Sequence, residues 1–223
     1  MRLDKFLVEM NIGSRSQVKE LIKKKLILVN NEIALRPESH IDPYKDSISY
    51  QSIILTYAKY VYYMLNKPAG VISATYDNNC PTVVDLLKTE NKKDLFPVGR
   101  LDKDTEGLLI ITNDGELAHR LLSPKSHVPK SYFAMIDGVL SEEDIYTLEN
   151  GMDIGEEKFT LPAHVVVESC SKQESNVTIT ITEGKFHQVK RMFLGVNRKV
   201  LYLKRISMGH LFLDKELPLG SYR

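Results

Sequence analysis

Apolar residues recur with the period of an α-helix in two segments at the start of the chain. The first segment, MRLDKFLVEM, has apolar residues at i, i+3, i+4 and i+7, namely Leu3, Phe6, Leu7 and Met10. The sequence NIG ends this helix, and Ser14 and Gln17 then have the spacing of a capping box. A second amphipathic helix is predicted after them, with its apolar face at Val18, Leu21 and Ile22.

Two short runs that favour β-structure follow the helices, LILV at 26–29 and EIAL at 32–35, with Asn-Asn between them. This arrangement predicts a β-hairpin with a two-residue turn. From Ser49 to Lys59 the pattern loses its period, so we place a domain junction there. The predicted organisation is a domain at 1–50, a linker at 51–59 and a larger domain at 60–223.

The larger domain contains many segments rich in the β-branched and aromatic residues that strands favour. These segments are YVYYML, LFPV, GLLIIT, KSYFAMI, AHVVVE, NVTITIT and KVLYL. Three others are predicted to be helices: PTVVDLL, ELAHRLL and SEEDIYTLENG. The pattern predicts an α+β fold with a mixed, mainly antiparallel sheet, and the alternation in NVTITITEG predicts that one face of that strand is wet or lines a cleft.

Composition narrows the setting. At 223 residues and 43% hydrophobic content, the chain is long enough for one sizeable core and a smaller companion domain. No stretch approaches the roughly 18 apolar residues of a membrane span, and the charged N-terminus is unlike a signal peptide, so we expect a cytoplasmic protein without a membrane partner. Cys80 and Cys170 are the only cysteines, in no paired spacing, which argues against disulfides and zinc.

The formal net charge is only +1, but the charge is unevenly distributed. Residues 1–25 contain seven basic and three acidic residues, and residues 184–205 contain seven basic residues and no acid. Clustered cations favour a phosphate backbone as partner, because their binding releases counterions. Either cluster taken alone is equally compatible with a solvated helix face.

The two N-terminal helices and the hairpin resemble the RNA-binding domain of small-subunit ribosomal protein four, which also occurs in many RNA-modifying enzymes. The resemblance is carried by RLDKFL and GSRSQVKELIKKKLILVNNEI, in that order. It implies RNA contacts from the basic residues Arg2, Lys5, Arg15, Lys19 and Lys23. The alternative is a small helical domain whose lysines only keep it soluble.

The stretch GRLDKDTEGLLIITNDG, at 99–115, places three carboxylates directly before an apolar run. These acids either hold a loop together or include a residue that does chemistry. The stretch closely resembles the signature of pseudouridine synthases that act on ribosomal RNA, with Asp102 at the position of the catalytic aspartate. LNKPAGVIS, KSYFAMIDG and EGKFHQVKRMF match the other blocks of that family in order, and the N-terminal domain completes the small-subunit (RsuA) type.

The resemblance implies a reaction that needs no cofactor and no metal. The bond from nitrogen 1 of uracil to the anomeric carbon is cleaved, the base turns, and carbon 5 forms the new bond. Asp102 is implied to act at the anomeric carbon as nucleophile or base, and the resemblance leaves both roles open. Lys190 is implied to pair with Asp102, since a nearby cation favours an ionised carboxylate. The alternative for Asp102 is a buried residue that ties down a turn.

The target uridine must leave the RNA stack to reach a carboxylate. Tyr132 matches the family tyrosine that packs on the extruded base, and Arg100 resembles an arginine that contacts RNA beside it. The alternative for Arg100 is a salt bridge to Asp104 or Glu106, which we interpret as loop residues rather than metal ligands. Further RNA contacts are expected on the cleft rim from Lys130, Lys185, His187, Gln188 and Arg191.

The expected substrate depends on which branch of the family the chain resembles. HQVKRMF is more similar to the small-subunit branch than to the large-subunit branches, which commonly replace the histidine. We therefore expect a monomeric enzyme acting on one uridine of 16S ribosomal RNA in an assembly intermediate. The alternatives are a 23S ribosomal RNA synthase and a non-catalytic RNA-binding assembly factor. Asp102, Tyr132 and Lys190 together argue against the latter.

Overall fold

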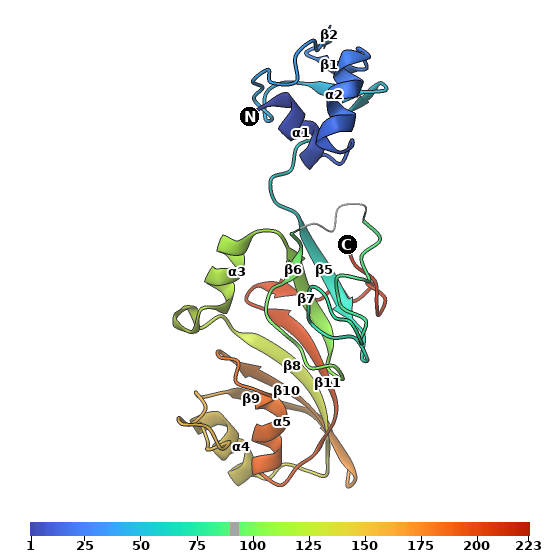
Figure 1. The fold of residues 1–223 in the computed structure, drawn as a ribbon. Helices are drawn as coiled ribbons and strands as arrows, with labels where there is room; N and C mark the ends of the chain where they lie inside the picture. The colour runs from blue at the N-terminus through green and yellow to red at the C-terminus, as the bar shows by residue number, and fades with distance from the viewer. Residues whose placement is uncertain (90–93) are drawn as a thin grey trace. The chain divides into compact units, whose positions relative to one another are not determined.

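The computed structural model describes residues 1–89 and 94–223. The chain forms two compact units, Met1–Tyr60 and a larger unit that begins at Val61 (Figure 1). Within the described part of the chain, no helix is both long and apolar enough to cross a membrane.

The first unit is built on the two predicted helices, α1 (Leu3–Glu9) and α2 (Arg15–Lys23). The capping box is present: the Gln17 amide donates to Ser14 Oγ at 3.4 Å, and the Ser14 amide donates to Gln17 Oε1 at 2.7 Å. The predicted apolar faces form most of its core, whose fully or almost fully buried members include Leu3, Phe6, Leu7, Val18, Ile22, Ile27 and Ile48. Both helix predictions are confirmed.

A four-stranded sheet completes this unit, with β1 (Ile27–Val29), β2 (Glu32–Ile33), β3 (Ile48–Tyr50) and β4 (Ile53–Ile54) in the order β2-β1-β3-β4. The predicted hairpin is β1–β2. Asn30 and Asn31 at its turn have φ of 53° and 66°, as a type I′ turn requires.

The sheet extends into the segment predicted as a linker. Gln51 and Ser52 have φ of 50° and 65° and form a second two-residue turn, which pairs β4 with β3. The sequence pattern missed this turn because neither residue is a typical turn former at positive φ. The compact unit therefore continues to Tyr60, past the predicted domain end at residue 50.

The second unit is a mixed, mainly antiparallel sheet, as predicted. Its main strands are β5 (Tyr62–Lys67), β7 (Glu106–Thr112), β8 (Lys130–Asp137), β9 (His164–Cys170), β10 (Glu174–Ile181) and β11 (Val200–Met208). Their order is β5-β7-β11-β8-β10-β9, and only the pair β7–β11 is parallel. Two short strands extend the sheet, β6 (Phe96–Pro97) on β7 and β12 (Leu211–Phe212) on β11.

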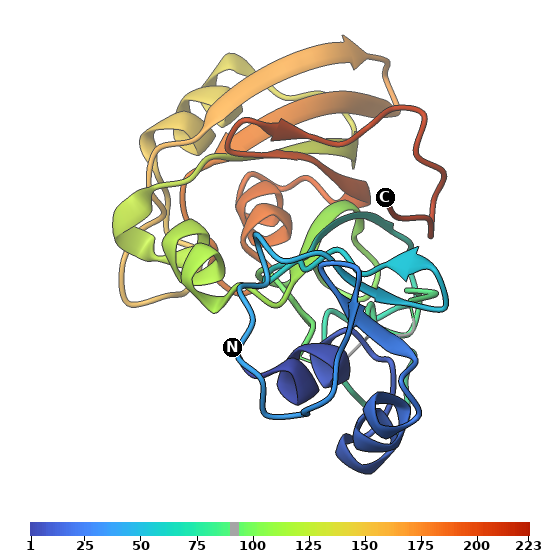
Figure 2. The same cartoon turned by 90° about the horizontal axis from the view of Figure 1, so that it is seen from above.

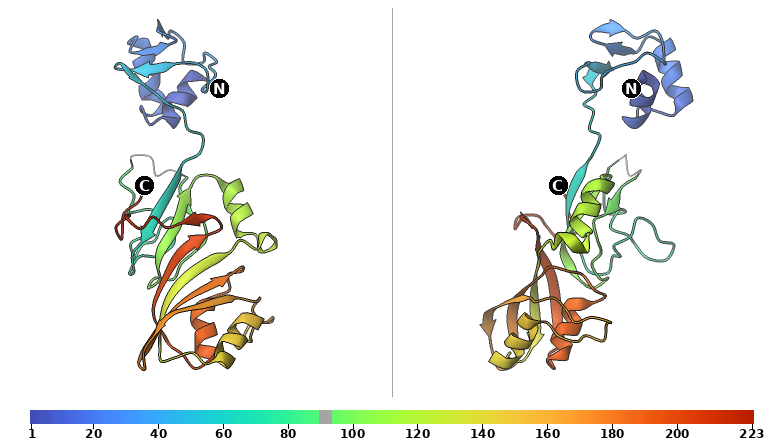
Figure 3. Two further views of the ribbon diagram at one scale, coloured as in Figure 1. Left: turned by 180° about the vertical axis from the view of Figure 1, so that it is seen from behind. Right: turned by 90° about the vertical axis from the view of Figure 1, so that its left-hand side faces the viewer.

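Helices cover both faces of this sheet, because β7 is apolar on both sides. Leu109 and Ile111 pack in the core that contains buried residues of α4 (Glu142–Asn150) and α5 (Gln188–Gly195). Leu108 and Ile110 pack instead with Ala118 of α3 (Gly115–Leu122). A short 3₁₀ helix, η1 (Pro124–Ser126), follows α3. Figure 3 shows α4 and α5 near each other at the β9–β10 end of the sheet.

One predicted helix is absent. PTVVDLL, at 81–87, forms turns in which the Asp85 amide donates to Thr82 O at 3.1 Å and the Leu87 amide donates to Val84 O at 3.2 Å. Thr82 also uses its side chain to bind the Asp85 carboxylate. The Thr82 and Asp85 side chains also bind each other's backbone amides, and the turns that result bury Val83, Val84 and Leu87 without a helix.

The C-terminal segment returns to the first strand of the larger unit (Figure 2). Tyr222 bridges Leu65, and Met64 and Arg223 exchange backbone hydrogen bonds at 2.9 and 3.1 Å. This segment therefore adds a short antiparallel pairing at the outer edge of β5.

Gly107 is required where β7 meets β11. Its φ is +100°, and a Cβ there would lie 2.3 Å from the Arg205 carbonyl oxygen. Gly107→Ala is expected to lower the free energy of unfolding by about 3–5 kcal/mol, since backbone strain and a steric clash add. Gly115→Ala is the control, because a Cβ there meets nothing within 4 Å. Urea unfolding followed by circular dichroism compares them, and equal midpoints would contradict the expected clash.

Candidate active site

Asp102 lies in the loop that leads into β7, and the end of β5 fastens this loop. Lys67 is fully buried, and its Nζ donates to the carbonyl oxygens of Thr105 at 2.8 Å, Asp102 at 3.0 Å and Pro68 at 3.1 Å. A further contact reaches the Lys103 carbonyl at 3.3 Å. Burial lowers the pKa of Lys67 to about 8, with Asp104 and Asp102 acting in the opposite direction. Lys67 is therefore mainly an ammonium at neutral pH.

Two more residues after Lys67 hold the same loop. Ser73 Oγ donates to the Leu101 carbonyl at 2.8 Å and accepts from the Leu101 amide at 3.0 Å. The Gly70 amide donates to the Lys103 carbonyl at 2.8 Å. The block LNKPAGVIS thus acts as a clamp on the block GRLDKDTEG, which gives a physical reason for their joint presence. The sequence analysis missed Lys67 and Ser73, and no local pattern marks their role.

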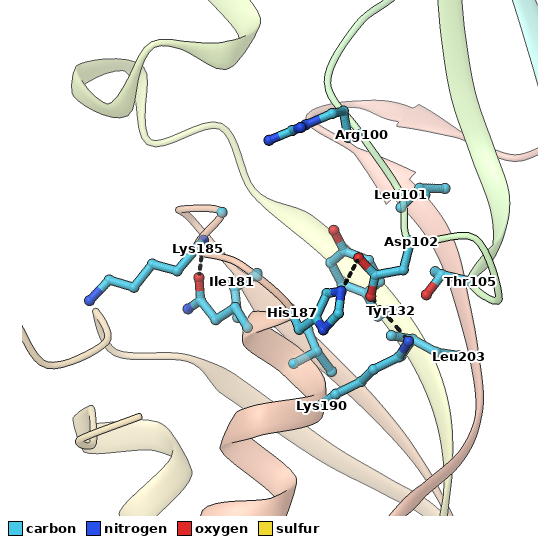
Figure 4. Close-up of a pocket in the computed structure, with 13 residues that line it drawn as sticks. Arg100, Leu101, Asp102, Thr105, Tyr132, Ile181, Lys185, His187, Lys190 and Leu203 are labelled. Carbon is cyan, nitrogen blue, oxygen red and sulfur yellow. Dashed lines mark hydrogen bonds and ion pairs between the residues drawn. The ribbon is translucent and has the colours of Figure 1, made fainter. Parts of the chain in front are cut away.

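The clamped loop presents Asp102 to α5. Lys190 Nζ lies 3.1 Å from Asp102 Oδ2 and 2.6 Å from Asp104 Oδ1, and His187 Nε2 lies 3.4 Å from Asp102 Oδ1. Figure 4 shows the Asp102 carboxylate between His187 and Lys190. His187 occupies the N-cap position of α5 with φ of 49°, so the start of the helix brings both basic residues to one carboxylate.

Asp104 is more than a loop residue, because it is the nearer partner of Lys190. The hydrogen bond from Lys190 lowers the pKa of Asp104. Burial opposes the charge on Lys190, but its hydrogen bonds to Asp104 and Asp102 raise its pKa overall. The cluster is therefore an ammonium shared by two carboxylates, of which Asp102 is 27% exposed and Asp104 75% exposed. In the described ranges, no three His, Cys, Asp or Glu residues gather as a metal site.

A cleft of about 720 Å³ opens over this cluster, next to a smaller pocket of about 100 Å³. Both are lined by Asp102 and by Tyr132, which is 8% exposed on β8. Arg100 is exposed, lines both, and makes no ion pair within the described ranges. Its alternative partners are engaged elsewhere, Asp104 by Lys190 and Glu106 by the Tyr202 hydroxyl at 2.7 Å.

Three residues expected as RNA contacts have partners within the protein. Gln188 is 3% exposed, donates to Glu183 Oε1 at 2.8 Å and accepts from the Lys185 amide at 2.9 Å. Arg191 binds Glu156 at 2.6 Å and the Ile154 carbonyl, and it does not line the cleft. Lys185 Nζ binds the carbonyls of Lys158 and Phe159, although the residue still lines the cleft. Helical spacing alone does not reveal these partners, because those of Gln188 precede the helix and those of Arg191 and Lys185 come from the loop at 154–159.

The basic residues of the first unit divide into two groups. Arg2 forms an ion pair with Asp4 at 2.8 Å, and Lys5 lies 3.7 Å from Glu9. Arg15, Lys19 and Lys23 are exposed on α2 and form no ion pair within the described ranges. The exposed face of α2 therefore carries three cations that are free to meet phosphates.

Two family models match the chain. The S4 domain model matches residues 1–43, and the RNA pseudouridylate synthase model matches residues 61–194, which include the clamped loop and the start of α5. The chain belongs to the RNA pseudouridylate synthase family. It is an RNA pseudouridine synthase, an isomerase, and it binds RNA through its S4 domain.

Full-length relatives agree with this family. An uncharacterized RNA pseudouridine synthase, YtzG, of Bacillus subtilis (strain 168) is 46% identical and covers 100% of this chain and 94% of its own. Ribosomal small subunit pseudouridine synthase A of Haemophilus influenzae is 36% identical, covering 100% and 95%. Ribosomal large subunit pseudouridine synthase B of Bacillus subtilis is also 36% identical, covering 100% and 91%.

A solved structure supports the same fold. A crystal structure of pseudouridylate synthase is 35% identical to this synthase, covers 100% of this chain and 95% of its own, and superposes with a TM-score of 0.68. The predicted α+β fold with a mixed, mainly antiparallel sheet is thus confirmed for the synthase.

The free cations on α2 predict a specific salt dependence of RNA binding. A variant with Arg15, Lys19 and Lys23 all changed to glutamine is expected to bind RNA more weakly. Each lost phosphate contact removes roughly 0.7–0.9 from the slope of log K against log salt, so the slope falls by about 2. Filter binding between about 50 and 200 mM salt measures it, with the exposed Lys172→Gln as control. An unchanged slope in the triple variant would exclude α2 from the RNA contact.

Proposed function

We propose that this synthase converts one uridine of 16S ribosomal RNA, in an assembly intermediate, to pseudouridine, with Asp102 acting at the anomeric carbon. The observation that carries the proposal is the Asp102 carboxylate beside Lys190 and His187 at the edge of a cleft of about 720 Å³. The Lys190 ammonium places a positive charge 3.1 Å from the carboxylate that acts as nucleophile or base in this proposal.

Each of the other site residues has a role in this proposal. Tyr132 packs on the uracil ring after the uridine has been flipped out of its stack. The Tyr132 ring lines the same pocket as Asp102. Arg100 contacts the RNA beside the flipped base, since it is exposed on the cleft and unpaired among the described residues. Lys130 and Lys185 add positive charge along the same cleft.

His187 supports the small subunit as the source of the substrate. It contacts Asp102 in this synthase, and it belongs to HQVKRMF, which resembles the small-subunit branch more than the large-subunit branches that commonly replace the histidine. Relatives named for small-subunit and for large-subunit ribosomal RNA match at the same 36% identity, so total identity does not discriminate between them. We also expect this synthase to be a monomer and to be cytoplasmic.

Mapping pseudouridines in the ribosomal RNA of the host tests this proposal. A strain that lacks the gene is expected to lose one pseudouridine in 16S ribosomal RNA and to regain it when the wild-type gene is restored. Loss of a pseudouridine in 23S ribosomal RNA instead would support the large-subunit alternative. No change at any position would support a non-catalytic assembly factor.

A further inference from the structure

Arg205 is a buried cation on the floor of the cleft. It is 2% exposed, lies on β11 opposite Tyr132 of β8, and lines the cleft of about 720 Å³. Directly opposed residues of adjacent strands project from the same face of a sheet. The guanidinium therefore lies beside the ring on which the flipped uracil is proposed to pack.

The guanidinium lacks most of its partners. Nε donates to the Leu108 carbonyl at 2.8 Å, but Nη2 is buried without a hydrogen-bond partner, and no described carboxylate forms an ion pair with Arg205. A buried charge without a counter-charge is strongly unfavourable. In contrast, Lys190 in the same site has two carboxylate partners. Arg205 is thus a buried positive charge without a counter-charge in the part of the chain that the structure describes.

Lys130, the first residue of β8, adds a second cation to the same cleft. Its Nζ donates to the Val128 carbonyl at 2.9 Å. Burial lowers the pKa of Lys130, and the charge of Arg205 acts in the same direction, whereas Glu183 opposes it. Glu183 itself accepts hydrogen bonds from the Leu161 amide and from Gln188, so it serves the neighbouring loop.

We propose that Arg205 and Lys130 form an anion site that takes a phosphodiester group of the substrate RNA next to the flipped uridine. A uracil carbonyl would satisfy a donor but leave the Arg205 charge without a counter-charge, whereas a phosphate supplies acceptor oxygens and negative charge together. A guanidinium fork also matches two phosphate oxygens. This inference depends on the proposed function only because it takes the substrate RNA as the ligand of the site.

The sequence holds a signal for this site. In VLYLKRISM the buried positions alternate, at Leu203, Arg205 and Ser207, so an arginine occupies a core-facing position of an alternating strand. Such a position normally carries an apolar residue, and a buried arginine is almost always paired. The charge count over 184–205 hides this distinction, because it treats exposed and buried cations alike.

Inorganic phosphate is the first probe. The unfolding temperature of the whole protein is measured in potassium phosphate and in potassium chloride at equal ionic strength. Phosphate is expected to stabilise the wild type and the exposed control Lys172→Met more than it stabilises Arg205→Met and Lys130→Met. The general salting-out effect of phosphate acts on all four proteins alike, so the difference between them reports the site. Equal stabilisation of all four would overturn the proposal.

The second experiment measures kcat and KM on ribosomal RNA of the host, with the RNA on which the wild type is active. Lys130→Met is expected to raise KM about 10- to 100-fold with kcat changed much less, as loss of a charge-assisted contact predicts. Lys130→Met also decides the question if Arg205→Met does not fold. An unchanged KM in a folded Lys130→Met would reject the site. Absence of turnover by the wild type would instead contradict the proposed function, while the phosphate measurement would still decide on the anion site.

Discussion

Asp102→Asn is expected to lower turnover by at least about 10³-fold, because the amide has neither the charge nor the basicity of the carboxylate. The fold should persist, since Lys190 keeps its 2.6 Å contact with Asp104 and is not left as an unpaired charge. RNA affinity should also persist, because it comes mainly from cations and stacking. The pseudouridine content of nucleoside digests after incubation with RNA measures the loss.

Asp104→Asn is the matched control for this prediction. It removes a carboxylate from the same loop and the same lysine, but it leaves Asp102 and its contact with Lys190 in place. We expect it to retain substantial activity. If Asp104→Asn were as inactive as Asp102→Asn, the chemistry would depend on the shared ammonium or on Asp104 itself, and the assignment to Asp102 would be wrong.

Lys67→Met is expected to have the second largest effect, although Lys67 lies outside both pockets. The change removes the ammonium that binds the carbonyls of Asp102 and Thr105 and leaves those acceptors unsatisfied. Each buried unsatisfied group costs about 1–3 kcal/mol, so the free energy of unfolding is expected to fall by about 3–5 kcal/mol. A shift of Asp102 by about 1 Å should lower kcat about 10²-fold.

The control for Lys67 is Lys103→Met, an exposed lysine of the same loop. It is expected to leave stability close to that of the wild type. Urea unfolding and kcat on ribosomal RNA are measured for both variants. Wild-type kcat and stability in Lys67→Met would show that the loop holds its shape without the clamp.

Local sequence patterns predict most of the helices and strands of this synthase because local chemistry determines them. Ser14 begins a helix with the predicted capping box, and Asn30 and Asn31 make the predicted turn. The pattern fails where side chains bind the backbone at short range, as Thr82 and Asp85 do in the segment predicted as a helix. Such turns depend on geometry that periodicity does not contain.

The site is less accessible from sequence than the fold. Asp102 and Lys190 are 88 positions apart, and only resemblance to a family joins them before the structure is known. Gln188 and Arg191 resemble RNA ligands by type, but their partners are Glu183 and Glu156. Lys67 looks like any lysine at the end of a strand, and only the four carbonyls around its Nζ reveal its function. Contacts that no periodic pattern contains decide each of these roles.

The most direct test of the central claim is tritium release from host 16S ribosomal RNA labelled at carbon 5 of uridine, because forming the new bond at carbon 5 expels that hydrogen. The assay is run on the wild type, Asp102→Asn and Asp104→Asn, beside an RNA-binding measurement on the same preparations. The account predicts release by the wild type and Asp104→Asn, and binding without release by Asp102→Asn. Measurable release by Asp102→Asn would contradict it.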